Sequence, residues 1–406
     1  MEIIIQKFGG TSVSSSNNRD AVKNKIQTAI EHGLSPVVVV SAMGRKGDAY
    51  STDTLIDFLK NENLSVSNRE MDAMMCCGEI ISSCVMAAHL QKHGIKAMAL
   101  TGGQAGIVTD SEYGSAHIKN IKTSNLLHLL EDGFIPVVCG FQGITENNNN
   151  FTTLGRGGSD TTAAALGAAL HAKCIEIYTD VDGIMTADPR IVKEANILDT
   201  VTYQEVAQMA HNGAKVIHPR AVEIAMSSNI PMIIKSTFSN AVGTLISNER
   251  GNGAVGTDVE FSSKIASGIA NMGNLSQFRV VLNPSNLDDG QKMFQSIAAA
   301  GISVSFLNLS EKEAMFATFR DDVDRTCNVL DKAGFKYICN KECGKVTLIL
   351  TARRGMYGLM AKFVSALSMQ GITILQTVDS DNTISAIVNE NNMIAAVQAL
   401  HKEFNL

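Results

Sequence analysis

Five short apolar runs in the first 235 positions constrain the fold of this chain more than any other feature. They are Ile3–Ile5, Val37–Val40, Ile135–Val138, Ile175–Tyr178 and Met232–Ile234. Because few polar residues interrupt them, they predict strands buried on both faces, as in a parallel sheet covered by helices. Helix-length segments such as Met71–His93 and Thr161–His171 lie between them. The sequence therefore predicts a layered α/β domain that binds ligands at the carboxyl ends of its strands.

The pattern changes beyond the glycine-rich stretch Ser239–Glu260, which shows no sustained periodicity. Gly301–Val304 recurs later as Gly371–Ile374, and each copy lies between an amphipathic helical segment and a further strand. Two βαββαβ-like units are the economical interpretation, and one larger α+β domain with a coincidental repeat is the alternative. The predicted boundaries are 1–245 for the first domain, 246–262 for a linker, and about 263–340 and 341–406 for the two small units, consecutive or interleaved.

Composition excludes several classes of protein. With 406 residues, 45% hydrophobic and 18% charged, the chain suits a globular protein of two or three domains. A net charge of −6 and the absence of tryptophan argue against a nucleic-acid partner. No apolar run reaches the roughly 20 residues that span a bilayer, and MEIIIQKFGG lacks signal-peptide features. We expect a cytoplasmic protein with no membrane partner. Its eight cysteines form no Cys-x-x-Cys pair and are expected to be buried free thiols.

Two glycine-rich turns indicate an anion site. Lys7 ends the first strand, and Gly9 and Gly10 follow it, so that backbone N–H groups and one cation can approach a phosphate. The spacing is not that of a P-loop, and a plain tight turn is the alternative. The second turn, Gly155–Asp160, opens a helix, whose free N–H groups and positive dipole end suit an anion. Arg156 adds a guanidinium that fits a carboxylate or a phosphate.

A third segment, Tyr178–Arg190, leaves a buried strand and combines carboxylates, a glycine and a cation. Asp180, Asp182 and Gly183 are spaced like the start of an EF-hand, but the later glutamate and the flanking helices do not fit. We interpret the segment as a loop that shapes a nucleotide site. Lys215 offers another phosphate cation, with an ordinary surface lysine as the alternative.

The remaining titratable groups narrow the range of reactions that the chain could catalyse. Glu79 lies in an otherwise apolar helical segment, so it has either a function or a structural salt bridge. No Ser-His-Asp or Cys-His signature stands out, and His32, His89, His93 and His117 look scattered on helices. A kinase that phosphorylates a hydroxyl needs a positioned base, whereas a carboxylate with a pKa near 4 is already a nucleophile. The residues therefore favour phosphoryl transfer to a carboxylate.

Taken together, the motifs resemble those of the aspartokinases over the whole length of the chain. They are most similar to the single-subunit type of Bacillus-like bacteria with two C-terminal ACT domains, partly through the long segment SAMGRKGDAYSTDTL. The motifs are KFGGTSV at Lys7–Val13, VVVVSAMG at Val37–Gly44, GE at Gly78–Glu79, LTGGQAG at Leu100–Gly106, GFQG at Gly140–Gly143, TTLGRGGSDTTA at Thr152–Ala163, YTDVDGIMTADPR at Tyr178–Arg190 and GAKVIHPRAVE at Gly213–Glu223. The resemblance implies an α/β amino-acid-kinase fold with a mostly parallel sheet, followed by two ferredoxin-like βαββαβ (ACT) units.

The resemblance also implies an activity. An aspartate kinase transfers the γ-phosphoryl group of ATP to the β-carboxylate of L-aspartate and gives 4-phospho-L-aspartate and ADP. This is the first step toward lysine and diaminopimelate, threonine and methionine, and Mg²⁺ is expected to arrive with ATP rather than on a protein ligand. The alternatives are another amino-acid kinase, such as a glutamate kinase, and an amino-acid-sensing pseudo-kinase. The presence of Lys7, Glu79, Arg156 and Asp160 argues against the pseudo-kinase.

Roles carry over from the family residue by residue. Lys7 is expected to stabilise the transferring phosphoryl group and Asp160 to organise that lysine. Arg156 is expected to hold the α-carboxylate of aspartate, and Glu79 its α-ammonium. The other implied substrate positions are Thr52, Gly157, Gly158 and Ser159. The implied ATP positions are Lys7, Gly9, Gly10, Ser41, Thr179, Asp180, Met185, Asp188, Arg190 and Lys215.

The two ACT units are expected to bind an amino-acid effector (lysine, threonine or meso-diaminopimelate) and to form a homodimer or a higher homo-oligomer. The implied effector positions are Asn308, Tyr357, Gly358 and Leu359. The tail departs from the family where a Pro-Gly turn often opens the first helix of an ACT unit. Asn283–Gly290 and Gly355–Leu359 stand there instead, so the identity of the effector stays open.

Overall fold

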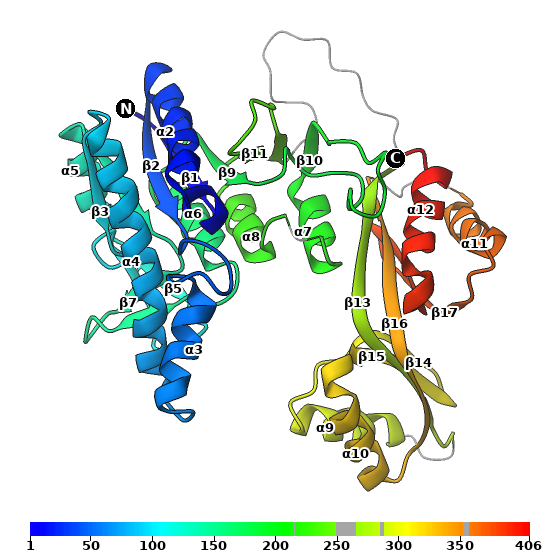
Figure 1. The fold of residues 1–406 in the computed structure, drawn as a ribbon. Coiled ribbons are helices and arrows are strands. Elements are labelled where there is room, and N and C mark those ends of the chain that lie inside the picture. The colour runs from blue at the N-terminus through cyan, green and yellow to red at the C-terminus, as the bar shows by residue number, and fades with distance from the viewer. Residues whose placement is uncertain (215, 249–264, 285–287, 352–356) are drawn as a thin grey trace. The chain divides into compact units, whose positions relative to one another are not determined.

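The computed structural model describes residues 1–214, 216–248, 265–284, 288–351 and 357–406 (Figure 1). They form two compact units, and the chain passes between the units several times. Unit 1 comprises residues 1–184, 197–207 and 215–260, and unit 2 comprises residues 185–196, 208–214 and 261–406. Most of the predicted linker, 246–262, lies outside the described residues.

Unit 1 is built on an eight-stranded sheet in the order β10-β12-β11-β9-β1-β2-β6-β3. The strands from β11 to β3 pair in parallel, whereas β12 is antiparallel to β11. The strands are β1 (Glu2–Phe8), β2 (Leu34–Val40), β3 (Ala97–Leu100), β6 (Ile135–Cys139), β9 (Cys174–Thr179), β10 (Thr200–Thr202), β11 (Met232–Ser236) and β12 (Thr244–Ser247). All five apolar runs lie in these strands, so the predicted, mostly parallel sheet is confirmed. Strand β12 lies within Ser239–Glu260, the stretch without sustained periodicity, and its backbone pairs with both neighbouring strands.

Helices cover both faces of this sheet. Val22 and Ile26 of α2 and Met86 of α4 share one buried cluster with Phe8 of β1. On the opposite face α6 packs closely, because Gly167 leaves room for Ile175. The helices of unit 1 are α1 (Gly10–Val13), α2 (Ser16–Glu31), α3 (Thr52–Glu62), α4 (Asn68–Lys92), α5 (Ser124–Glu131), α6 (Gly158–Ala169) and α8 (Pro219–Ser227), and α7 (Tyr203–His211) crosses the division between the units. A four-stranded sheet in the order β5-β4-β7-β8 completes the unit, with β4 (Ile107–Thr109), β5 (Ile118–Ile121), β7 (Gln142–Thr145) and β8 (Phe151–Thr153).

The longest helix among the described residues, α4, could by its sequence be either a membrane span or a core helix. Among the described residues it is the one helix long and apolar enough, by length and composition alone, to cross a membrane. It is instead a core helix of unit 1, because half of its most apolar window is buried. Its solvent-facing side carries Cys77 and Cys84, so the prediction that all eight cysteines are buried is wrong for these two, and Cys174, Cys327 and Cys339 are only half-buried. All eight are free thiols, as predicted.

Unit 2 holds one six-stranded antiparallel sheet in the order β14-β15-β13-β16-β18-β17. Its elements are β13 (Ala266–Val281), α9 (Asp289–Ala299), β14 (Ser305–Leu309), β15 (Glu313–Phe319), the short helix η1 (Arg320–Asp322), α10 (Val323–Ala333), β16 (Lys336–Leu350), α11 (Leu359–Met369), β17 (Ile374–Asp379), β18 (Thr383–Asn389), the short helix η2 (Glu390–Asn392) and α12 (Met393–Glu403). Two separate apolar clusters lie along this sheet, one under α9 and α10 and the other under α11 and α12. The two small βαββαβ units predicted from the sequence are therefore present.

The two small units share strands β13 and β16, which run the length of the sheet (Figure 1). The C-terminal half of β13 lies in the first apolar cluster with Phe278, and its N-terminal half lies in the second with Ala266 and Ile269. The N-terminal half therefore supplies the fourth strand of the second ferredoxin-like unit, although it precedes the first unit in the sequence. The two small ferredoxin-like units within unit 2 are therefore interleaved rather than consecutive in the sequence.

The repeated Gly-Ile motif has a local physical cause. Gly301 (φ 66°) follows α9, and Gly371 (φ 67°) follows α11, both in the left-handed region that glycine favours. The next residue in each copy, Ile302 or Ile372, donates its N–H to the carbonyl five residues earlier, at 3.3 and 3.1 Å. These are Schellman caps, and each isoleucine is buried in the core of its own unit. The repeat therefore reflects the same helix ending used twice.

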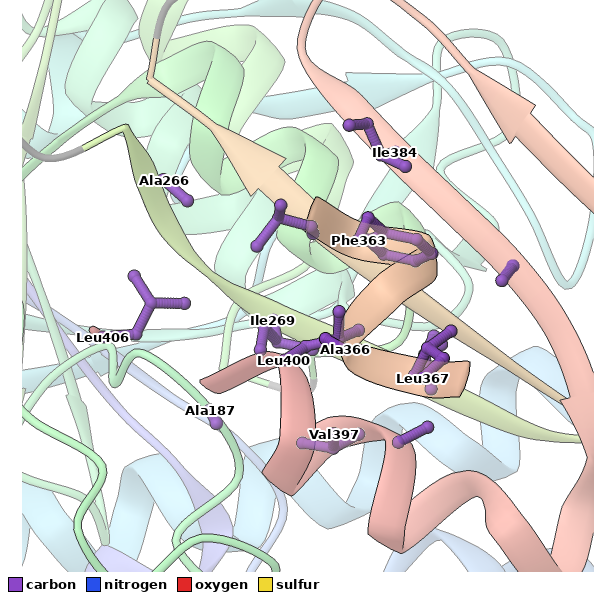
Figure 2. Packing of buried hydrophobic residues seen from close by; sticks show 14 of the residues in the cluster. Ala187, Ala266, Ile269, Phe363, Ala366, Leu367, Ile384, Val397, Leu400 and Leu406 are labelled. Atoms are coloured by element: carbon purple, nitrogen blue, oxygen red, sulfur yellow. The ribbon is translucent and has the colours of Figure 1, made fainter. Parts of the chain in front are cut away.

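Residues 185–196 belong to unit 2, although they lie within the first 235 positions of the chain. Figure 2 shows Ala187 in the buried cluster that also contains Val397 and Leu400 of α12. Thr186 makes two contacts within unit 2. Its carbonyl accepts from Ile269 N–H at 2.7 Å, and its hydroxyl lies 2.9 Å from Nε2 of His401. The segment is thus part of the hydrophobic core of unit 2.

Candidate active site

The parallel strands of unit 1 end together and bring the sequence motifs to one edge of the sheet. Phe8 of β1 pairs in register with Val40 of β2 and with Tyr178 of β9. The residues that follow these strands, Gly9, Ser41 and Asp180 among them, therefore lie at the same carboxyl edge. The predicted position of the site at the strand ends agrees with this arrangement.

Lys7 and Asp160 form an ion pair at this edge. Nζ of Lys7 lies 2.6 Å from Oδ1 of Asp160, and each side chain is 13% exposed. Lys7 comes from β1, and Asp160 comes from the first turn of α6, 153 positions later. An ammonium this close to a carboxylate at a helix N-terminus is held in one position while part of it remains accessible to an anion.

Two glycine turns border this pair, and both require glycine. A Cβ on Gly10 would lie 2.3 Å from the carbonyl oxygen of Ala42, so only glycine allows the turn after β1 to approach the turn after β2. Gly157 has φ 69°, and a Cβ there would lie 2.2 Å from Cγ of His218. The side chains of His218 and Phe141 fill the space beside Gly157 and Gly158, so only glycine lets α6 begin this close to them.

Glu79 lies deep in the unit with half of its carboxylate unpaired. It is 2% exposed; Oε1 accepts from Ala42 N–H at 3.0 Å, while Oε2 has no protein partner among the described residues. Burial raises the pKa of this carboxyl to about 8, although the hydrogen bond from Ala42 lowers it. A buried carboxylate oxygen without a donor is suited to a cationic ligand.

The remaining predicted substrate residues differ in exposure. Arg156 is exposed, and the structure gives its guanidinium no partner among the described residues. Ser159 is buried against Gly140 in the first turn of α6, and Thr52 is the half-buried first residue of α3. The turn that holds Arg156 and the helix that carries Glu79 both belong to unit 1.

The predicted nucleotide loop is divided by the structure. Thr179 ends β9, and Asp180 pairs with Arg45 at 3.2 Å on the surface of unit 1. Met185, Asp188 and Arg190 belong to unit 2, where Arg190 pairs with Asp188 at 2.6 Å. Lys215 lies outside the described residues. The sequence treats Tyr178–Arg190 as one loop, but the chain passes into the other compact unit after Ile184.

Comparisons with known proteins agree with this architecture. Residues 2–236 match the amino acid kinase family, and residues 338–402 match the ACT domain. The chain is 44% identical to aspartokinase 1 of Bacillus subtilis over 406 residues, which cover all of both proteins. The chain belongs to the aspartokinase family. It is also 38% identical to an aspartokinase of Geobacillus stearothermophilus, covering 100% of this chain and 98% of that one.

A solved aspartokinase supports the same fold. Aspartokinase III of Escherichia coli, in complex with aspartate and ADP, superimposes with a TM-score of 0.81 at 25% identity and covers 100% of both chains. The resemblance inferred from the motifs is therefore confirmed, as is the fold of a kinase domain followed by ACT units.

One buried aspartate was not predicted from the sequence. Asp72 of α4 is 0% exposed; its Oδ2 accepts from the N–H groups of Gly114 and Thr153 at 3.0 and 2.8 Å, and its Oδ1 accepts from the Thr153 hydroxyl at 2.8 Å. Burial raises the pKa of Asp72, against these three hydrogen bonds, which lower it. Because Thr153 lies three residues before Arg156, Asp72 anchors the strand that leads into the arginine turn. An aspartate near a helix start has no local signal that separates this role from a favourable dipole position.

We expect Asp72→Ala to lower the free energy of unfolding by about 3 kcal/mol, because it leaves the buried N–H and hydroxyl of Thr153, and the less buried N–H of Gly114, without an acceptor. Asp72→Asn keeps one carbonyl oxygen for these N–H groups and is expected to lose much less. Thermal unfolding of both variants measures the difference. Equal loss in the two variants would show that the acceptor oxygens are not what stabilises this strand.

The predicted effector residues lie in unit 2. Asn308 is exposed on the edge strand β14, and Tyr357 is 97% exposed. Gly358, with φ 80°, caps the N-terminus of α11, and Leu359 is 5% exposed in the core of the second small unit. Leu359 therefore packs in the core, and Gly358 and Asn308 offer mainly backbone and amide groups to a ligand.

Proposed function

We propose that unit 1 transfers the γ-phosphoryl group of ATP to the β-carboxylate of L-aspartate. The observation that carries this proposal is the Lys7–Asp160 pair at the carboxyl edge of the sheet, between two glycine turns. A related E. coli enzyme binds aspartate and ADP in the same fold, which supports the same pair of ligands here.

The proposed reaction needs no general base. The β-carboxylate of aspartate is ionised at neutral pH, and one of its oxygens attacks the γ-phosphorus of ATP. A carboxylate–phosphorus bond forms while the bond to the β,γ-bridging oxygen breaks, and that oxygen leaves with ADP. The energetic requirement is to neutralise charge and align the two substrates in line. Lys7 supplies a fixed positive charge, and Asp160 keeps it in place without a mobile water shell.

Mg²⁺ enters this proposal as part of the nucleotide substrate. Bound to the ATP phosphates, it would neutralise part of their charge. The turn after β1 and the N-terminus of α6 are suited to phosphate oxygens, because backbone N–H groups and the positive end of the α6 dipole lie there. Ser41, Thr179 and Asp180 lie at the same strand edge and complete the proposed ATP site within unit 1.

Aspartate recognition is assigned to two groups of opposite charge. Among the described residues, Oε2 of Glu79 has no partner and suits the α-ammonium group, and the guanidinium of Arg156 has none and suits the α-carboxylate. Thr52, Gly157, Gly158 and Ser159 are the proposed walls of the pocket. These two charges fit any free α-amino acid, so the choice of aspartate over glutamate rests on the family.

We further propose that unit 2 is regulatory, that its ACT units bind lysine, threonine or meso-diaminopimelate, and that the chain forms a homodimer or higher homo-oligomer in the cytoplasm. The ACT domain match supports the regulatory role. The proposed functional boundaries are 1–245, 246–262 and 263–406, except that residues 185–196 and 208–214 belong to unit 2, and the two ACT units divide within the shared strands β13 and β16.

A coupled assay of ADP release tests the proposal directly. With MgATP, we expect turnover with L-aspartate and little with L-glutamate, and the three candidate effectors added singly should identify any inhibitor. Equal turnover of the two amino acids would overturn the aspartate assignment. Absence of turnover with both, in a chain that still binds ATP, would favour the pseudo-kinase.

A further inference from the structure

A cluster of three possible metal ligands lies in unit 1 away from the strand edge. Asp20 comes from α2, whereas His89 comes from α4 and His93 caps its C-terminus. Nε2 of His89 lies 3.1 Å from Oδ1 of Asp20, and Nε2 of His93 lies 3.5 Å from the same oxygen. The sequence predicts scattered helical histidines; His89 and His93 do lie on and at the end of α4 but are neighbours, and His117 is not helical.

The geometry points to a site for a Zn²⁺-like transition-metal ion, and we propose that Asp20, His89 and His93 bind one. Two residues four apart on a helix present their side chains on the same face, and the two imidazole rings lie 5.0 Å apart between centroids. The three ligand atoms all lie within 4.8 Å of one another, and within the described residues this is the one such group found. In a tetrahedral zinc site with bonds of 2.0–2.1 Å, neighbouring ligand atoms are about 3.4 Å apart. The distances from Oδ1 of Asp20 to Nε2 of His89 and of His93, 3.1 and 3.5 Å, are close to this value.

The ligand set selects the class of ion. Two imidazoles and one carboxylate suit Zn²⁺, Ni²⁺, Co²⁺ or Cu²⁺, whereas Mg²⁺ prefers oxygen ligands only. The side chains of His93 and Asp20 are 35% and 46% exposed, so an ion and a water as fourth ligand can reach them. His89 is 8% exposed and gives the site one fixed ligand. Arg19 adds a positive charge nearby, but its Nη1 donates to the carbonyl of Val13 at 2.8 Å.

The site would join two helices that pack on the same face of the sheet. Val22 and Ile26 of α2 share a buried cluster with Met86 and Leu90 of α4. An ion bound at Asp20, His89 and His93 would link these helices near their solvent-exposed ends and stabilise the folded chain by mass action. The inference does not depend on the proposed activity, because none of its residues belongs to the site at the strand edge.

Metal binding by the full-length chain, first stripped with a chelator, tests the proposal at pH 7.5. We expect calorimetry to detect one Zn²⁺ per chain and thermal unfolding to shift upward by several degrees with Zn²⁺ but not with Mg²⁺. His93→Ala and Asp20→Asn should each weaken Zn²⁺ binding at least about tenfold. His128→Ala, which removes an exposed histidine on α5, is the matched control and should leave binding unchanged.

Co²⁺ provides a spectroscopic check on the ligands. Visible absorption of tetrahedral Co²⁺ without a thiolate charge-transfer band, lost in His93→Ala, would support the His–His–Asp site. A thiolate band would instead assign the ion to cysteines such as Cys77 and Cys84, which are exposed on the same helix. Such a band, or Zn²⁺ binding undiminished in a variant that lacks both Asp20 and His93, would overturn the proposal. A stability loss in Asp20→Asn that is the same with and without Zn²⁺ would reduce the cluster to an ordinary hydrogen bond.

Discussion

Replacing Lys7 with methionine should lower kcat about 10³-fold, with much smaller changes in KM for ATP and for aspartate. The reason is that the ammonium, held 2.6 Å from Asp160, acts on charge that develops on the transferring phosphoryl group. An interaction made mainly in the transition state affects kcat and kcat/KM alike. Steady-state rates of ADP release at saturating MgATP measure the effect.

Lys235 offers a matched control for that experiment. It lies on β11 in the same sheet and pairs with the buried Glu176 at 3.0 Å, so Lys235→Met also leaves one carboxylate without its cation. Gln6 contacts the same Glu176, and Gln6 and Lys7 are neighbours on β1, so Lys235 lies on the face of the sheet opposite to Lys7. Lys235→Met should lower stability yet retain kcat. Near-normal turnover in Lys7→Met would remove Lys7 from the transfer step, whereas an equal loss in both variants would indicate general damage to the sheet.

The sequence predicts the strands of unit 1 well, because a strand buried on both faces is a continuous apolar run that can be recognised locally. Val37–Val40 has no polar residue, which is typical of a central parallel strand. No local sequence pattern shows that strand β13 is shared by two units. Its N-terminal half pairs with β16 about eighty positions away, and the choice of that partner depends on which apolar cluster it completes. Local periodicity therefore predicts the repeat but not its interleaving.

The candidate site likewise has some features that the sequence predicts and others that it does not. The glycine turns are visible in the sequence because glycine is needed for close backbone approach at Gly10 and Gly157. Lys7 and Asp160 lie 153 positions apart in the sequence, so their pairing came only from the family resemblance. Asp72 and Asp20 were missed because their partners lie on other elements. A single carboxylate on a helix looks like a solvated charge until the fold places donors or imidazoles beside it.

The pH dependence of aspartate binding should follow Glu79. Burial raises the pKa of this carboxyl to about 8, so at pH 7 it is mostly protonated before substrate arrives and must ionise to pair with the α-ammonium group. KM for aspartate is therefore expected to fall as the pH rises toward 8, by up to about tenfold per unit. The effect on stability has the opposite direction. Between the unfolded pKa of 4.5 and the folded pKa, the folded state binds the extra proton, so the contribution of Glu79 to stability decreases as pH rises.

Glu79→Gln separates these two effects, because it keeps the shape of the side chain but fixes it in a neutral form. We expect KM for aspartate to rise about 100-fold, since the α-ammonium group loses its charged partner, and its dependence on pH below 8 to disappear. The same variant should unfold at a higher temperature than the wild type at pH 9 and at nearly the same temperature at pH 5, because no buried charge has to form. Glu79→Asp retains a titrating carboxylate and serves as the control. A KM that keeps its pH dependence in Glu79→Gln would assign the titration to another group, whereas lower stability at pH 9 would mean that a cation absent from this structure already neutralises Glu79. The two measurements together therefore distinguish a carboxylate kept unpaired for substrate from one that is merely structural.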